Sequence, residues 1–287
     1  TETESSTRKT RLIASTRTCR YHAEIAMLPT PSTSHVSFDT IYEPAEDSYL
    51  FLDTLSSESE SEWLRARFSD APTPLVVEVG SGSGVVLAFA AANVRHIFGR
   101  DDVLTLGTDV NGDACRATQE TVTKAVAETM STDGNPRSRS QFVASLTADL
   151  FAPLRPGSVD VLLFNPPYVP TPDVPSLPSP LDKPQSQLSR TEKFERDSYF
   201  LSLTYAGGAD GMEITNRFLE TMPEVLHPER GTAYVLFCAQ NQPTLVLERI
   251  QNEWPGWKAE VVGRSGSKAG WEKLVIIRIW RDSSAYN

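Results

Sequence analysis

The sequence has few of the residues that build metal centres and disulfide frameworks. Its 287 residues include three cysteines and four histidines. The cysteines are widely spaced, and no two of them stand at the spacing of a zinc or redox motif. The histidines are far apart, and none belongs to an H-E-x-x-H pattern. We therefore expect neither a disulfide framework nor a metal in this chain.

Long apolar runs and an excess of positive charge are also missing. No hydrophobic stretch approaches the roughly 20 residues of a membrane-spanning helix. The formal net charge is −10, whereas a general nucleic-acid binder needs surplus Lys and Arg to face phosphates. The composition indicates a protein of a reducing compartment. We expect it in the cytoplasm, with the nucleus as a further location.

The start of the chain is rich in Ser, Thr and Arg and has no regular apolar pattern. We expect residues 1–36 to form a disordered extension. A transit peptide is the alternative, because such peptides are rich in Arg and Ser. Glu2, Glu4 and Glu24 argue against it. The folded domain is then expected over residues 37–287.

From Leu75 onward, short apolar runs alternate with helical stretches. This alternation predicts a doubly wound α/β fold, a mostly parallel sheet of about seven strands with both faces covered. The last two strands follow each other without a helix, so we expect one antiparallel pair at an edge. The expected strands lie at residues 74–80, 102–110, 141–150, 158–164, 231–239, 258–266 and 272–280, and the expected helices at 45–55, 84–94, 113–130, 213–226 and 243–254.

Two segments fall outside this framework. The acidic run S-S-E-S-E-S-E at residues 56–62 is expected to be flexible. Residues 170–200 form a proline-rich insertion, with six prolines from Pro170 to Pro184, and its first half is expected to be extended or disordered. The insertion follows the fourth strand directly, so it either gates an active site or is a tolerated surface insertion.

Ligands of doubly wound sheets bind beyond the carboxyl ends of the strands, near the point where strand order reverses. The first strand ends in E-V-G-S-G-S-G, which contains Glu78, Gly80 and Gly82. Glycines here permit a tight turn and let a ligand approach closely. The spacing matches neither the dinucleotide motif nor the phosphate-binding P-loop.

The next two strands end in acids. Asp109 can accept both ribose hydroxyls of an adenosine. Its alternative role is to cap the next helix, which Asn111 or Asp113 could also do. Asp149 can accept from the adenine amine while Leu150 packs on the ring, and the alternative is an ordinary loop acid.

This series of glycines and acids predicts an adenosine ligand without phosphates. S-adenosylmethionine fits it more readily than NAD. S-adenosylmethionine carries a sulfonium and an ammonium group, and a nearby carboxylate favours positive charge. Glu78 would then stabilise the positive charge of that ligand.

The fourth strand ends in Asn165, Pro166, Pro167 and Tyr168, and two prolines cannot continue a central strand. The Asn165 side chain and the Pro166 carbonyl offer acceptors for both N–H bonds of a primary amide, and Tyr168 offers a stacking face. This rigid corner would hold the amide nitrogen in line with a methyl–sulfur bond. Acceptors that polarise the N–H bonds raise electron density on nitrogen, so no general base is required. The alternative is an ordinary loop exit.

Other functions remain open from the residues alone. A lysine acceptor would arrive as an ammonium that must be deprotonated, for which the N-P-P-Y corner offers little. An adenine base in DNA fits poorly with the net charge of −10. A cofactor-binding scaffold without turnover is the third possibility, and the presence of Asn165 and Tyr168 argues against it.

Several segments resemble, in order, the eukaryotic HemK-type glutamine methyltransferases, from about Ser37 to Trp280. These enzymes modify the Gly-Gly-Gln motif of the class 1 translation termination factor. N-P-P-Y alone is shared with N6-adenine DNA methyltransferases, whereas the first two segments together with A-G-G-A-D-G are more specific. The segments are YEPAEDSYLFLD, EVGSGSGVV, TDVN, TADL, LLFNPPYV, YAGGADGMEITNRF and GRSGSKAGWEKLVIIRI.

The resemblance implies a class I, Rossmann-like methyltransferase that depends on S-adenosylmethionine. It also implies roles for individual residues, and for Ser48 it is the only basis. Catalytic roles fall to Asn165, Pro166 and Tyr168, and Pro167 completes the substrate contacts. The expected cofactor contacts are Ser48, Glu78, Gly80, Gly82, Asp109, Asp149, Leu150 and Asn165.

The resemblance finally implies a partner. Catalytic subunits of this kind work with a small zinc-binding activator shared among several methyltransferases, and any zinc would belong to that activator. Addition of a parallel strand at an open sheet edge is a physically reasonable mode of contact.

Overall fold

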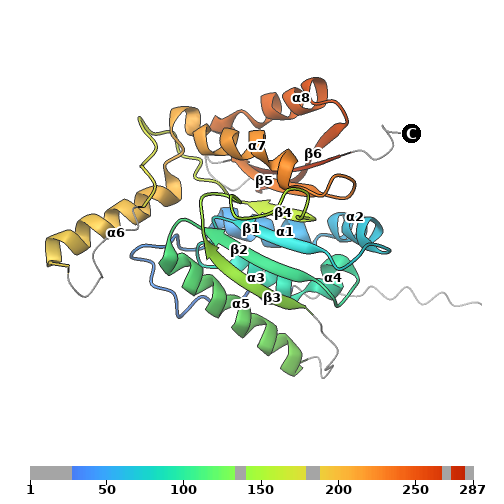
Figure 1. Cartoon of the computed structure of the whole chain (residues 1–287), viewed down its shortest axis with the longest axis horizontal. Helices are drawn as coiled ribbons and strands as arrows, with labels where there is room; N and C mark the ends of the chain where they lie inside the picture. Colours follow the sequence, from blue (N-terminus) through green and yellow to red (C-terminus); the bar gives the residue numbers. More distant parts are fainter. Residues whose placement is uncertain (1–27, 133–139, 179–187, 267–272, 282–287) are drawn as a thin grey trace, which may run out of the picture.

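The computed structural model describes residues 28–132, 140–178, 188–266 and 273–281. Within these ranges seven strands form one sheet. The strands are β1 (Leu75–Val79), β2 (Leu104–Asp109), β3 (Gln141–Thr147), β4 (Val161–Phe164), β5 (Thr232–Cys238), β6 (Trp257–Arg264) and β7 (Leu274–Arg281). Their order is β3-β2-β1-β4-β5-β7-β6 (Figure 1).

The doubly wound arrangement is confirmed, and every strand lies where the sequence predicts one. All pairings among strands β1 to β5 are parallel. Strand order reverses between β1 and β4, which places the ends of these two strands side by side. The antiparallel part differs from the expectation of a single pair, because β7 lies between β5 and β6 and is antiparallel to both.

Helices cover both faces of the sheet. They are α1 (Glu46–Ser56), α2 (Glu58–Phe68), α3 (Val85–Ala92), α4 (Val94–Phe98), α5 (Gly112–Thr132), α6 (Arg190–Tyr205), α7 (Glu213–Val225) and α8 (Pro243–Glu253). Val76 packs with apolar residues of α1 to α5, whereas its neighbour Val77 packs with α7 and α8. This alternation along β1 is what a strand buried on both faces requires. Among the helices that the structure describes, none is long and apolar enough to cross a membrane.

The prediction of a flexible acidic run at residues 56–62 is wrong. Residues from Glu58 form helix α2, with Ser57 as N-cap accepting from the Glu60 backbone N–H. Acids in a first turn are favourable because they lie at the positive end of the helix dipole. The run therefore begins a helix rather than a loop.

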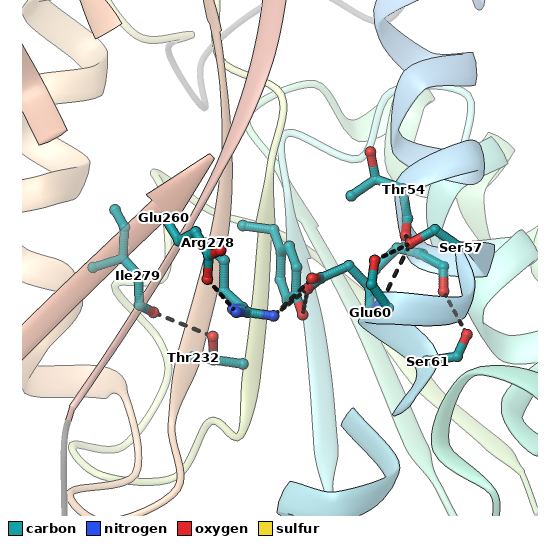
Figure 2. Close-up of polar contacts among 11 residues, drawn as sticks. Thr54, Ser57, Glu60, Ser61, Thr232, Glu260, Arg278 and Ile279 are labelled. Atoms are coloured by element: carbon teal, nitrogen blue, oxygen red, sulfur yellow. Dashed lines mark hydrogen bonds and ion pairs between the residues drawn. The ribbon is translucent and has the colours of Figure 1, made fainter. Parts of the chain in front are cut away.

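Glu60 anchors that helix to the sheet. Its side chain is only 4% exposed, and both of its carboxylate oxygens accept from Arg278 Nη1, at 2.7 and 2.6 Å (Figure 2). The Tyr234 hydroxyl donates to the same carboxylate at 2.9 Å. The Arg278 guanidinium also lies 4.0 Å from the Trp63 ring centroid. A buried carboxylate with this set of partners ties α2 to β5 and β7.

Two further helices were not expected from the sequence. One is the short α4, and the other is α6, which occupies the second half of the proline-rich insertion. Ser189 and Glu192 form a capping box at the start of α6, and the S-x-x-E spacing is a recognisable signal for it. Figure 1 shows α6 projecting beyond the sheet on one side.

Residues before the predicted boundary at residue 37 also pack against the domain. Pro31 is buried, and the His35 Nε2 atom lies 3.1 Å from the Thr121 hydroxyl of α5. Residues 28–36 thus pack against the domain. Residues 1–27 lie outside the described residues, and the expectation of a disordered extension stays a prediction for them.

Replacing Glu60 with alanine is expected to lower the free energy of unfolding by about 3 kcal/mol, because Arg278 would lose its buried partner and keep only the exposed Glu260. The measurement is urea unfolding followed by circular dichroism. Glu62→Ala is the matched control, since Glu62 is exposed on the same helix and should change stability by less than about 0.5 kcal/mol. Equal stabilities of the two variants would contradict this role of Glu60.

Candidate functional site

The residues singled out from the sequence surround one cavity of about 520 Å³. It lies beyond the carboxyl ends of β1, β2, β3 and β4, where a doubly wound sheet binds its ligand. In the described part of the chain, no three His, Cys, Asp or Glu side chains are grouped so that they could hold a metal ion. The predicted residues on the cavity wall are Ser48, Glu78, Gly80, Gly82, Asp109, Asp149, Leu150, Asn165, Pro166, Pro167 and Tyr168.

The turn after β1 needs glycine at several positions, for two structural reasons. Gly80 and Gly82 have φ values of +63° and +53°, which side chains with a Cβ rarely adopt. Gly84 is required for another reason, because a Cβ there would lie 2.6 Å from the Thr118 Cα of α5. Gly80 and Gly82 therefore present backbone without a side chain to the cavity, and Gly84 lets α3 pack closely on α5.

Asp109 holds this turn in place. Its Oδ2 accepts from the Gly82 N–H at 2.9 Å, and its Oδ1 accepts from the Asn111 N–H at 2.8 Å. The cap of helix α5 is Asn111, whose side chain accepts from the Asp113 N–H at 2.9 Å. Asp109 is thus not needed as a cap. Burial raises its pKa, while the backbone N–H donors of Asn111 and Gly82 oppose that rise.

Glu78 is a buried carboxylate on the cavity wall, only 4% exposed. Its Oε2 accepts from the Leu87 N–H at 2.9 Å. Gly84 is the N-cap of α3 and has no side chain that could cap the helix. Glu78 instead accepts from one of the unpaired backbone N–H groups in the first turn of α3. Burial raises the pKa of Glu78 well above its ordinary value; the Leu87 N–H lowers it, and the Asp109 charge adds to the rise.

Asp149 and Leu150 follow β3, and Asp149 has a partner that the sequence did not indicate. Its Oδ2 pairs with Arg217 Nη2 of α7 at 2.5 Å, and both side chains are partly exposed. Arg217 also lines the cavity. Leu150 has a φ of +50°, an uncommon conformation for a residue with a Cβ. The adenine contacts expected of these two residues stay a prediction, now with Arg217 beside them.

The N-P-P-Y corner is held by an acid that sequence reasoning missed. Asp47, next to the predicted Ser48, accepts from Asn165 Nδ2 at 3.0 Å and from the Tyr168 hydroxyl at 3.4 Å. Asn165 Oδ1 is buried and has no hydrogen-bond partner among the described residues. Asn165 lines the cavity, and this oxygen is an acceptor that the described residues leave without a donor. Asp47 stands in the E-D-S segment, from which only Ser48 was predicted as a site residue.

The backbone of the A-G-G-A-D-G segment packs closely against the backbone of the N-P-P-Y corner. A Cβ at Gly207 would lie 2.5 Å from the Pro167 carbonyl oxygen, and one at Gly211 would lie 2.1 Å from the Tyr168 carbonyl oxygen. The Asn241 side chain donates to that Tyr168 oxygen at 3.1 Å. These glycines are needed because the two backbones approach too closely for any larger residue.

The first half of the proline-rich insertion contributes to the cavity as far as it is described. Val174, Pro175, Ser176 and Leu177 line it together with Phe200 of α6. The Tyr199 hydroxyl donates to the Ser176 carbonyl at 2.6 Å, which joins the two halves of the insertion. Residues 179–187 lie outside the described part of the chain. The insertion is therefore part of the cavity wall, and a gating role stays a prediction.

No protein-family model matches the chain. Among curated proteins it is similar to Methyltransferase HEMK2 of Mus musculus, with 32% identity over 262 residues, which cover 88% of this chain and 96% of the relative. It is 30% identical to the eRF1 methyltransferase catalytic subunit mtq2 of Schizosaccharomyces pombe over 259 residues, which cover 89% of this chain and 96% of the relative. A putative protein N5-glutamine methyltransferase of Methanocaldococcus jannaschii is 30% identical, covering 84% of this chain and 92% of the relative.

The raised pKa of Glu78 makes a prediction about stability. The ionised side chain destabilises the fold of the empty protein, and this effect is absent below the ordinary glutamate pKa of about 4.3 and complete above the raised pKa. Glu78→Gln keeps an acceptor for the Leu87 N–H without the charge. We expect its melting temperature at pH 7 to rise by about 2–4 °C, the shift for a gain of about 1 kcal/mol.

The gain should shrink as the pH falls through the raised pKa of Glu78 and vanish near the ordinary glutamate pKa of about 4.3. Differential scanning fluorimetry of the ligand-free protein at several pH values measures it. Glu62→Gln, on an exposed position, is the control and should leave the melting temperature unchanged. A Glu78→Gln protein that melts earlier than wild type at pH 7 would contradict the prediction.

Proposed function

The chain belongs to the methyltransferase family of HEMK2 and mtq2, and on that premise we propose which group it methylates. The acceptor is the side-chain amide nitrogen of the glutamine in the Gly-Gly-Gln motif of the eukaryotic translation release factor. The relative from Schizosaccharomyces pombe is named as a methyltransferase of eRF1, and the archaeal relative as a putative N5-glutamine methyltransferase. The site of this chain suits that chemistry.

The methyl donor that we propose is S-adenosylmethionine, whose sulfonium carries the transferable methyl group. Three observations support it. The glycine turn leaves backbone exposed on the cavity wall, and Asp109 keeps lone pairs beyond its two backbone bonds for the ribose hydroxyls. Glu78 is a buried acid with a raised pKa, and a cationic ligand beside it would favour its ionised form.

The observation that carries the proposal is the vacant Oδ1 of Asn165. A buried acceptor without a partner is destabilising unless a ligand supplies a donor. A glutamine carboxamide supplies two N–H donors, one for Asn165 and one for the Pro166 carbonyl. Both residues line the cavity, and the rigid prolines keep the two oxygens at a fixed separation.

These acceptors also address the weak nucleophilicity of an amide. Its nitrogen lone pair is delocalised into the carbonyl, and acceptors on both N–H bonds return electron density to nitrogen as positive charge develops. Bound S-adenosylmethionine would supply the methyl group and leave as the neutral thioether S-adenosylhomocysteine, and the proton released from the nitrogen would pass to solvent. The chain's part is to hold the amide within reach and in line with the methyl group.

We also propose that the zinc-binding activator implied by the resemblance docks on β3. Among the described strands it pairs with β2 alone, and its other edge is open. Val143 in its middle is 54% exposed, which is unusual for an apolar strand residue in the absence of a partner. A strand added there would extend the sheet and cover Val143. We place this heterodimer in the cytoplasm, with the nucleus as a further location.

The function is tested with the chain co-expressed and purified with the small activator. The complex is incubated with S-adenosylmethionine and a Gly-Gly-Gln peptide, and mass spectrometry identifies the modified atom. We expect a methyl group on the glutamine side chain and none on the matched Gly-Gly-Lys peptide. Methylation of the lysine peptide alone would overturn the proposal, and transfer to neither peptide would favour a cofactor-binding scaffold.

Asn165→Ala is expected to remove most of the turnover, because the amide loses one of its two acceptors. The melting temperature should stay within a few degrees of wild type, since Asn165 lies on the cavity wall and not in the core clusters. Turnover is measured by release of S-adenosylhomocysteine. A near-normal kcat would exclude the amide clamp.

Asp109→Ala is expected to weaken cofactor binding by roughly 1.5–3 kcal/mol, the range for hydrogen bonds that involve a charged group. Isothermal titration calorimetry measures the change. Asp113→Ala is the control, because Asp113 lies one turn further along the chain, pairs with Arg116 and Arg196 and does not line the cavity. A dissociation constant that hardly moves in Asp109→Ala would exclude the ribose contact.

A further inference from the structure

We propose that Asp47 is a positioning residue, which fixes the Asn165 side chain with its oxygen towards the acceptor amide. The inference rests on the proposed function and concerns the same site. Asp47 is the second residue of α1 and is 3% exposed. It lines the cavity with Asn165 and Tyr168, although it stands 118 residues before Asn165 in the sequence.

One oxygen of Asp47 holds both polar side chains of the corner. Asp47 Oδ2 accepts from Asn165 Nδ2 at 3.0 Å and from the Tyr168 hydroxyl at 3.4 Å. No ion pair of Asp47 occurs among the residues that the structure describes. Its contacts are therefore directed at the corner and at the adjacent Ser48, and not at a structural cation.

The chemistry of a carboxylate decides which way Asn165 faces. An ionised carboxylate only accepts hydrogen bonds, so the neighbouring amide must present its NH₂ group to it. The opposite orientation would place the Asn165 oxygen against the Asp47 oxygen, and two acceptors repel. Oδ1 is thus forced to face away from Asp47, and it is the buried atom that lacks a partner among the described residues. The charge also polarises the amide and makes Oδ1 a stronger acceptor.

Asp47 is itself fixed, which makes a one-atom substitution informative. Its Oδ1 accepts from the Ser48 backbone N–H at 2.7 Å and from the Ser48 hydroxyl at 3.3 Å. In Asp47→Asn the Ser48 N–H keeps the new side-chain oxygen on its own side, so the new NH₂ group faces Asn165. Two NH₂ groups cannot bond to each other, and Asn165 must turn over. Asn165 then presents its NH₂ group, a donor, to the substrate amide in place of its oxygen.

The kinetic test compares wild type with Asp47→Asn in the complex with the activator. We expect kcat for the Gly-Gly-Gln peptide to fall about 10- to 100-fold, the loss of one charge-assisted hydrogen bond. The cofactor dissociation constant and the melting temperature should remain within twofold and about 2 °C of wild type, which separates positioning from a structural role. Asp53→Asn is the control, because Asp53 is exposed on the same helix. A kcat within twofold of wild type, or a loss of kcat matched by a loss of cofactor binding, would overturn the inference.

A second readout needs no turnover. In protein labelled with ¹⁵N-asparagine, the Asn165 side-chain NH₂ signal is identified by its absence from Asn165→Ala. We expect this signal to lie downfield in wild type, because a carboxylate accepts from it, and to move upfield in Asp47→Asn. An unchanged signal would overturn the inference. If wild type failed to methylate glutamine while the signal moved as expected, the proposed function would fail and the role of Asp47 in orienting Asn165 would stand.

Discussion

The hydrogen bond between Asp47 and Asn165 is the contact on which the chemistry of this site depends. It joins the start of α1 to the end of β4, and it sets which atom of an amide faces the cavity. The glycine segment behind the corner and the Asn241 side chain hold the backbone in place, whereas Asp47 holds the side chains. Rigid backbone and oriented side chain together present fixed acceptors to a substrate, as a reaction that relies on positioning requires.

The acidic residues of the cavity stabilise the fold and are also proposed to contact the ligand. Glu78 caps α3, and Asp109 ties the glycine turn to the start of α5. Burial raises the pKa of both carboxyls, so the empty site holds groups that are less stable ionised than they would be in water. A cation placed beside Glu78 offsets that penalty. The same residues shape the turn, and they suit the positively charged adenosine ligand that we propose.

The sequence predicted the strands well because apolar runs between glycines and acids are a local signal. It failed where a residue's role depends on a distant partner. Glu60 looked like part of a flexible acidic run because its partner Arg278 is 218 residues away. The pairing of Asp149 could not be predicted because Arg217 lies on α7, and nothing local distinguishes Asp47 from Ser48 as the residue that reaches Asn165. Helix α6 is a different case, since the Ser189–Glu192 capping box is a local signal that was not used in the prediction.

The central claim is that the site holds a carboxamide through both of its N–H bonds. It is tested most directly by offering the complex a Gly-Gly-Gln peptide whose glutamine already carries one methyl group on its side-chain nitrogen. One N–H bond is then missing, and the methyl group occupies the place of a hydrogen facing an acceptor. We expect no second methylation, measured by mass spectrometry after prolonged incubation with excess cofactor. A dimethylated product formed at a rate comparable to the first transfer would contradict the claim.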